Sequence, residues 1–120
     1  MSIASWKKEF YPITAVEAAK GDWITAVKHS IRKWEGMLER NLKKHNLRFE
    51  SLSDHRGVTS CALCRKIDDC RQCPLFKSTG RKCADPHSPW VFSRDKKDPK
   101  PMIKALRGTL KMLKKAASTL

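Results

Sequence analysis

The sequence predicts a mainly helical protein, a small domain in which two long amphipathic helices are joined by a cysteine-rich loop. Apolar residues recur every three or four positions in two separate stretches, which is the spacing of one buried helix face. All five cysteines lie between these stretches, at residues 61–83. The chain has 120 residues, enough for one hydrophobic core and too few for two, so we expect a single domain over residues 1–120.

The chain is strongly basic, with 26 Lys and Arg against 12 Asp and Glu and a net charge of +14. Residues 1–60 hold 11 basic and 7 acidic side chains, whereas residues 61–120 hold 15 and 5. A surface of this kind attracts polyanions, acidic proteins or anionic lipid. No apolar run approaches the roughly 18 residues of a membrane span, and the charged start does not have the pattern of a signal peptide. We therefore expect a soluble intracellular protein without a membrane partner.

Residues 1–50 form the predicted helical part. Thr14 and Glu17 have the spacing of a capping box, which predicts a short helix that ends at Gly21. Asp22 is the expected cap of a long helix over residues 23–44, and Asn46 is its expected left-handed end. One apolar stripe runs along that helix: Trp23, Val27, Ile31, Trp34, Leu38 and Leu42. Aromatic residues at this spacing are normally core residues, so the two Trp are interpreted as structural.

Residues 99–120 form the predicted basic amphipathic helix. Pro99 and Pro101 disfavour an earlier start, so the helix is expected from Met102. Its core stripe comprises Ile103, Leu106, Leu110 and Leu113, and the neighbouring face carries Lys104, Arg107, Lys111 and Lys114. No acidic residue follows residue 98. These cations either remain solvated or contact phosphates, and the lack of compensating acids slightly favours phosphate contact.

Residues 58–93 form the predicted metal module. Its spacing is Cys61-x2-Cys64-x5-Cys70-x2-Cys73-x9-Cys83, with His87 four residues later. A Cys-x2-Cys turn directs two thiolates to one ion, and two such contributions close a tetrahedral zinc site. The odd number of cysteines and the lack of an export signal argue against disulfides. We therefore predict a structural zinc ion that staples the loop.

Five cysteines and one histidine compete for four ligand positions. Cys61 and Cys64 are the strongest pair, because Arg65 and Lys66 follow them and offset the thiolate charge. Cys83 is the third expected ligand, after a turn at residues 78–80 that reverses the chain. The fourth position is a close choice that favours Cys73 over Cys70, which would sit nearby on a short helical turn, and His87 is a further alternative. The other histidines are expected to be solvated: His29, His45 and His55.

Other cysteine chemistries fit the sequence less well. The gap between Cys64 and Cys70 does not match ferredoxin spacing, which disfavours an iron–sulfur cluster, and redox thiols or a disulfide are the remaining alternative. A catalytic zinc needs an open position and a general base, and the only acids near the cluster are Asp68, Asp69 and Asp85. No phosphate-binding glycine loop, nucleophile elbow or His-Glu-x2-His motif occurs. We therefore expect a protein that is not an enzyme.

The order of motifs over residues 61–90 also resembles a known group of proteins. Cys-x-Leu-Cys, Cys-x2-Cys-Pro-Leu, Thr-Gly, Cys and then Ser88-Pro89-Trp90 are similar to small cysteine-cluster proteins encoded by bacteriophages and bacteria. The resemblance implies a cysteine metal site and a place in the cytoplasm of a bacterial host cell. Members of this group have no assigned activity, so it implies none here.

An aromatic pair adjoins a cationic segment directly after the cysteines. Trp90 and Phe92 either close the loop onto the helices or stack on bases, while the following cations hold phosphates. We predict a non-enzymatic zinc protein that binds DNA or RNA through a basic surface, formed by Trp90, Arg94, Lys96, Lys97, Lys100, Lys104, Arg107, Lys111 and Lys114. The alternative is a phage-encoded interaction protein that docks on a host enzyme or defence complex.

Overall fold

The computed structural model describes residues 2–55, 61–67 and 69–118, and every regular element within them is a helix, which confirms the mainly helical prediction. The α-helices are α1 (Ile3–Phe10), α2 (Ala15–Ala19), α3 (Trp23–Glu35), α4 (Glu39–Lys44), α5 (Ala62–Lys66), α6 (Pro74–Thr79), α7 (Pro89–Lys96) and α8 (Lys100–Ser118). Two 3-10 helices accompany them, η1 (Phe49–His55) and η3 (Cys70–Gln72). None of the helices in the described ranges is long and apolar enough to cross a bilayer.

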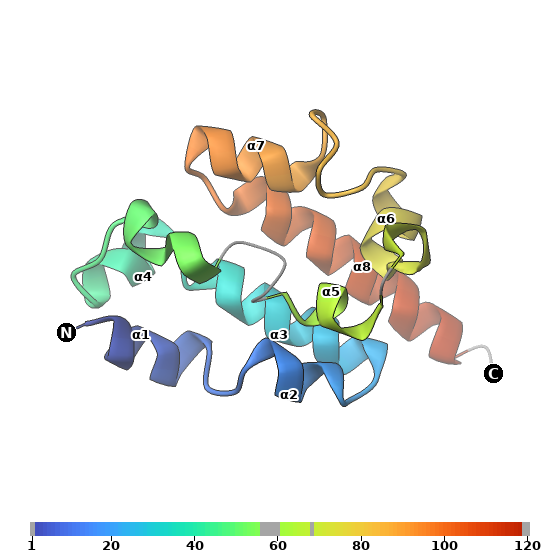
Figure 1. The fold of residues 1–120 in the computed structure, drawn as a ribbon, viewed down its shortest axis with the longest axis horizontal. Helices are drawn as coiled ribbons and strands as arrows, with labels where there is room; N and C mark the ends of the chain where they lie inside the picture. Colours follow the sequence, from blue (N-terminus) through green and yellow to red (C-terminus); the bar gives the residue numbers. More distant parts are fainter. Residues whose placement is uncertain (1, 56–60, 68, 119–120) are drawn as a thin grey trace.

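The two central helices, α3 and α8, pack against each other, and the shorter elements surround them (Figure 1). Helices α1 and α2 lie along the side of α3 that faces away from α8, and α6 and α7 pack on α8. The core therefore takes residues from both ends of the chain: Trp6, Val27, Trp34, Leu52, Leu63, Met102 and Leu106 are among its buried members.

The predicted helix starts of the first half are confirmed. The side chain of Thr14 accepts a hydrogen bond from the Glu17 backbone N–H at the start of α2. Asp22 accepts one from the Thr25 N–H, at 2.8 Å, at the start of α3. Asn46 follows α4 with a φ of 55°, in the left-handed region. Each of these signals acts within four residues, so sequence spacing alone identifies them.

The prediction of one helix over residues 23–44 is wrong, because the chain turns after Glu35 and begins α4 at Glu39. Gly36 is pressed against α1, where a Cβ at this position would lie 2.6 Å from Phe10 Cγ. The Trp6 indole N–H donates a hydrogen bond to the Gly36 carbonyl, at 3.0 Å. That carbonyl is consequently satisfied by a distant side chain, and the turn brings Met37 into the core.

The carboxy-terminal helix begins two residues earlier than predicted, at Lys100. Pro101 lies in its first turn, where a helix lacks an internal partner for the backbone N–H in any case. Asp98 accepts a hydrogen bond from the Lys100 N–H, at 3.0 Å, and so ties down this start. The predicted core stripe is confirmed, with Ile103 and Leu106 buried and Leu110 and Leu113 half-buried against the core.

The cysteine region is not a single loop, because its described residues form four helical elements: α5, η3, α6 and α7. Pro74 starts α6, and Gly80 ends it with a φ of 74°, so that Ser78 and Thr79, which were expected in a turn, form the last residues of the helix. Trp90 and Phe92 lie on α7, which Ser88 caps, and not on an extended segment. Trp90 is half-buried against the core, while Phe92 is 46% exposed.

Candidate metal centre and basic surface

Four cysteines lie on or next to two short helices, α5 and α6. Cys61 precedes α5 and Cys64 lies on it, Cys73 precedes α6, and Cys83 follows it. Cys73 is buried and the other three are half-buried. Cys70 is exposed and lies on η3, a short helical turn as predicted, while its place outside the ligand set stays a prediction.

The thiols of Cys61 and Cys64 are hydrogen-bonded to each other. The Cys64 thiol donates a hydrogen bond to the Cys61 sulfur, and this bond, together with the charge of Lys33, holds the pKa of Cys61 well below its usual range. The same bond keeps Cys64 protonated and raises its pKa. Burial raises the pKa of Cys83 to about 12, and the negative charge of Cys61 adds to that effect.

Helix α3 contributes two buried polar side chains to this neighbourhood, and neither was predicted from the sequence. Ser30 Oγ lies 3.9 Å from Cys61 Sγ. Lys33 is 1% exposed, and burial lowers its pKa, while the charges of the nearby cysteines oppose that shift. The sequence signal was the repeat at spacings of 4, 3 and 4 beside the main stripe of α3: Ala26, Ser30, Lys33 and Met37.

Lys66, one of the two residues expected to balance the thiolate charge, is directed at backbone carbonyls of the first half of the chain. The Lys66 ammonium donates to the carbonyls of Ala19 and Gly21 and lies 5.2 Å from the Trp23 ring centroid. Arg65 is exposed. The cation nearest in effect to the cysteines therefore comes from α3, about thirty residues earlier in the chain, and not from the segment after Cys64.

In the described part of the chain, no three Cys, His, Asp or Glu side chains are grouped so that they could hold a metal ion as they stand. The cysteine side chains nevertheless supply the thiol donors that zinc prefers. These donors are the hydrogen-bonded pair Cys61 and Cys64 and the two further thiols of Cys73 and Cys83. The other candidates are engaged or exposed. Asp69 pairs with Arg71, Asp85 pairs with Arg81, and His87 is exposed. Asp68 lies outside the described residues.

The expectation of solvated histidines is wrong for His29 and His45, which are both buried. His29 Nε2 lies 2.8 Å from the Ile13 carbonyl oxygen. His45 lies between α1 and the end of α4, with Nδ1 2.9 Å from Ser5 Oγ and Nε2 2.7 Å from Glu9 Oε1. His55 is half-buried, with its ring 5.3 Å from that of Trp6.

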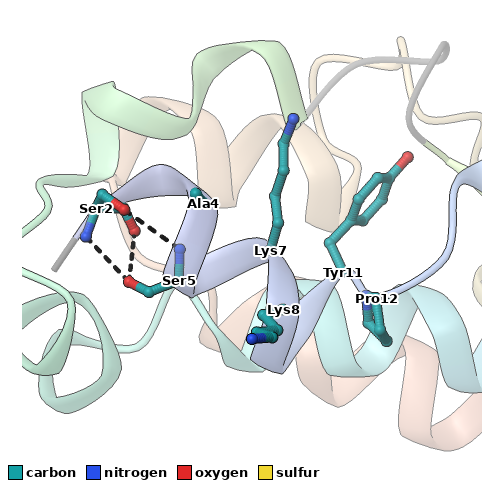
Figure 2. Close-up of a pocket in the computed structure, with 7 residues that line it drawn as sticks. All are labelled: Ser2, Ala4, Ser5, Lys7, Lys8, Tyr11 and Pro12. Atoms are coloured by element: carbon teal, nitrogen blue, oxygen red, sulfur yellow. Dashed lines mark hydrogen bonds between the residues drawn. The ribbon is translucent and has the colours of Figure 1, made fainter.

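The serine, histidine and carboxylate of this second cluster hold the fold together. The Ser5 hydroxyl also donates to the Ser2 carbonyl, at 2.8 Å, within the capping box of α1. A hollow of about 700 Å³ lies beside this cap, lined by the side chains shown in Figure 2. Its hydroxyl groups already have partners, since Ser2 and Ser5 bond to each other and the Tyr11 hydroxyl accepts from the Ala15 N–H. These groups therefore serve the fold and make this hollow a weaker candidate for a ligand site.

A smaller hollow, of about 230 Å³, lies between α4 and α8 and is lined by cations. We call its four basic residues the basic pocket: Arg40, Lys100, Lys104 and Arg107. Leu38 and Ile103 form the apolar part of its lining. Since one water takes about 30 Å³ of liquid, the hollow has room for a hydrated phosphate group. The Arg107 guanidinium also donates to the Glu35 carboxylate, at 2.6 Å.

The structure divides the nine predicted partner-binding residues into separate groups. Lys100, Lys104 and Arg107 share the basic pocket, and Arg40 is the member that was not predicted. Lys96, Lys111 and Lys114 are exposed on α7 and α8 outside that pocket. Arg40 was missed because α4 was expected to continue α3, and the turn at residues 36–38 changes its direction.

The predicted aromatic stacking group is arranged differently. The Arg94 guanidinium lies over the Trp90 ring, 5.1 Å from its centroid, and pairs with Asp95. Lys97 forms an ion pair with Glu50. The Trp90 ring thus has a cation on one face, and Phe92 is the more exposed aromatic ring of α7.

Comparison with known protein families, with curated proteins and with solved structures finds no match to this chain.

Proposed function

We propose that this is a non-enzymatic zinc-binding protein that binds nucleic acid, DNA or RNA, through the basic pocket. The observation that carries the proposal is the convergence of four cations from two helices around one hollow. Arginine and lysine side chains arranged in this way hold phosphate oxygens, and phosphate contacts supply most of the affinity of sequence-independent binding. Three further predicted binding residues are exposed cations on α7 and α8, outside the pocket: Lys96, Lys111 and Lys114.

Zinc would be held by the thiolates of Cys61, Cys64, Cys73 and Cys83. Four sulfur ligands leave no open position, so the ion would supply structural stability and no chemistry of its own. The bound ion would then stabilise the packing of α6 on α8, where Ser78 Oγ lies 2.5 Å from Thr109 Oγ1. Such a staple would compensate for the small core of a chain of this length.

A protein partner is the second candidate, since the resemblance of the cysteine segment points to phages and their bacterial hosts. The observation in its favour is a pair of exposed apolar side chains on and next to α2, Ile13 at 47% and Val16 at 48% exposure. An interaction protein of this type would use the basic pocket against an acidic surface of a host enzyme or defence complex.

Metal analysis of the purified protein tests the zinc part of the proposal. We expect one tightly bound zinc per chain, and strong destabilisation or insolubility of Cys61→Ser and Cys64→Ser, because the binding energy of a structural site is folding energy. Cys70→Ser is the matched control and is expected to be the mildest of the five cysteine variants. Iron, or less than about half an equivalent of any metal, would contradict a zinc staple.

Capture of partners from a bacterial lysate, with and without nuclease treatment, tests the nucleic-acid part. We expect nucleic acid to co-purify with the tagged protein. Nuclease digestion should remove this nucleic acid, together with any proteins that co-purify through it. A protein partner that survives digestion, with no nucleic acid bound beforehand, would favour docking on a host protein.

A further inference from the structure

Lys33 is an unusual member of the core, because a lysine side chain is almost never fully buried without a group that stabilises its charge. It lies on α3, one residue before the core residue Trp34, and its ammonium is 5.8 Å from the Trp34 ring centroid. Its exposure is 1%, so water does not provide that stabilisation.

The surroundings of Lys33 identify the compensating charge. Helix α5, which starts at Cys61 and carries Cys64, packs directly on α3. Ser30, one turn before Lys33 and fully buried, has its hydroxyl 3.9 Å from Cys61 Sγ. Burial lowers the pKa of Lys33, and the negative charge of Cys61, whose own pKa is lowered, is the strongest opposing effect. Helix α5 and the cysteines at its start therefore lie against the face of α3 that carries the buried Lys33.

We propose that Lys33 is the positioning residue of the metal centre, whose buried positive charge balances the thiolates that bind zinc. This inference rests on the proposed zinc site. A zinc ion with four thiolate ligands carries a net charge of −2, which is costly to bury without a cation beside it. Groups next to the ligands of a metal site tune its affinity in this way, and their loss weakens binding about 10- to 100-fold.

The local sequence offers no substitute for Lys33. Lys66, two residues after Cys64, is held by the carbonyls of Ala19 and Gly21, and Arg65 is exposed to solvent. The charge of an exposed cation is screened, whereas that of a buried cation acts at full strength on a neighbouring thiolate. Lys33 is therefore the cation whose removal changes the metal centre most.

The test compares the zinc affinities of Lys33→Met, Lys33→Arg and wild type, measured by competition with a chromogenic chelator. Methionine fills a similar volume without charge, and we expect it to weaken zinc binding at least about tenfold. Arginine keeps the charge and is expected to bind zinc nearly as tightly as wild type. Lys28→Met removes an exposed lysine of the same helix and serves as the matched control, with wild-type affinity.

The unfolding of the metal-free proteins separates this role from simple packing. Without zinc, Lys33→Met is expected to be at least as stable as wild type, because it no longer buries a charge. Should Lys33→Met fail to fold, Lys33→Gln, which keeps a polar group but no charge, takes its place with the same expected loss. Zinc affinity equal to that of wild type in either uncharged variant would overturn the inference. A loss of zinc affinity accompanied by a matching loss of stability in the metal-free variant would also overturn it. A wild type that binds no zinc would overturn the zinc site itself.

Discussion

At the scale of single residues, the buried imidazole of His29 links stability to pH. Its ring lies 4.9 Å from that of Tyr11, and its Nε2 contacts the Ile13 carbonyl. Burial lowers the pKa of His29 from 6.5, with a partly opposing effect of the hydrogen bond to Ile13. The unfolded chain therefore binds a proton at this residue at a higher pH than the folded protein does.

We expect the free energy of unfolding to fall as the pH drops below about 6.5, the pKa of an unperturbed histidine. The decrease should end at the lower pH at which His29 is protonated in the folded protein as well. His29→Gln, which keeps a side-chain N–H donor, should flatten this dependence in urea unfolding between about pH 5 and pH 7. His87→Gln removes an exposed histidine and is the control, with the wild-type slope retained. If the unfolding free energy of His29→Gln depends on pH as steeply as that of wild type, then His29 does not cause the pH dependence.

Sequence spacing predicted a metal module at the cysteines but not the buried polar residues of α3 that lie next to Cys61. A Cys-x2-Cys pair is a local signal, because its chelate geometry arises within a single turn. Lys33 gives the opposite signal, since a lysine next to an apolar stripe is typical of the solvated edge of a helix. The repeat of Ala26, Ser30 and Lys33 marks a second buried face of α3, but it does not indicate that α5 packs over that face.

At the scale of elements, the turn between α3 and α4 depends on one close approach. An added Cβ at Gly36 would lie 2.6 Å from Phe10 Cγ and 2.7 Å from Trp6 Nε1. Gly36→Ala is therefore expected to lower the free energy of unfolding by about 1–3 kcal/mol, the usual cost of overpacking a core. Chemical denaturation of the purified variants measures it.

Gly108 provides the matched control, because it lies inside α8 with nothing within 4 Å of the added Cβ. Gly108→Ala is expected to stabilise the protein by about 0.5–1 kcal/mol, the preference of a helix interior for alanine. Equal effects of the two substitutions would contradict the close packing of Gly36 against α1.

The two predicted core leucines of α8 should differ in importance. Leu106 is fully buried and Leu110 only half-buried, although both belong to the stripe that the sequence predicts. Leu106→Ala is expected to cost about 2–5 kcal/mol of unfolding free energy, as for other buried leucines, and Leu110→Ala clearly less. Thermal or urea unfolding of both variants checks the order, and a larger loss at Leu110 would contradict the packing of α3 on α8.

The sequence located those helices whose start, end and apolar face are all encoded locally. Thr14, Asp22 and Asn46 act within a few residues, and each does what its position predicts. The break at Gly36 was not predictable in this way, because helical periodicity continues across it and the contact with Trp6 is thirty residues distant. Of the basic pocket, the sequence predicted the three cations of α8 but not Arg40. Arg40 was missed because it lies after the break at Gly36, which changes the direction of the helix that carries it.

At the scale of the whole molecule, α3 and α8 join the cysteine cluster to the basic pocket. Ser30 and Lys33 of α3 face the cysteines, and Glu35 of the same helix binds Arg107 of the pocket. Helix α8 carries three of the pocket cations and packs on α6 through Thr109 and Ser78. A staple at the cysteines would thus stabilise the helix that presents the cations.

The salt dependence of nucleic-acid affinity tests the central claim, that the basic pocket binds phosphates. Wild type, a pocket variant and a control variant of equal charge are titrated against a labelled strand or duplex of about 20 nucleotides at several salt concentrations. The pocket variant replaces Arg40, Lys100, Lys104 and Arg107 by Gln. The control replaces four exposed lysines of the α1–α3 region by Gln: Lys7, Lys8, Lys20 and Lys28.

We predict that wild-type affinity falls as salt rises, and that the slope of log affinity against log salt becomes shallower in the pocket variant by about one unit for each cation that no longer binds a phosphate. The control variant should keep a slope close to that of wild type. Folding should be nearly intact in both, because solvated surface positions usually change stability by less than about 0.5 kcal/mol each. A pocket variant with the wild-type slope, or a wild type indifferent to nucleic acid at low salt, would contradict the proposed site.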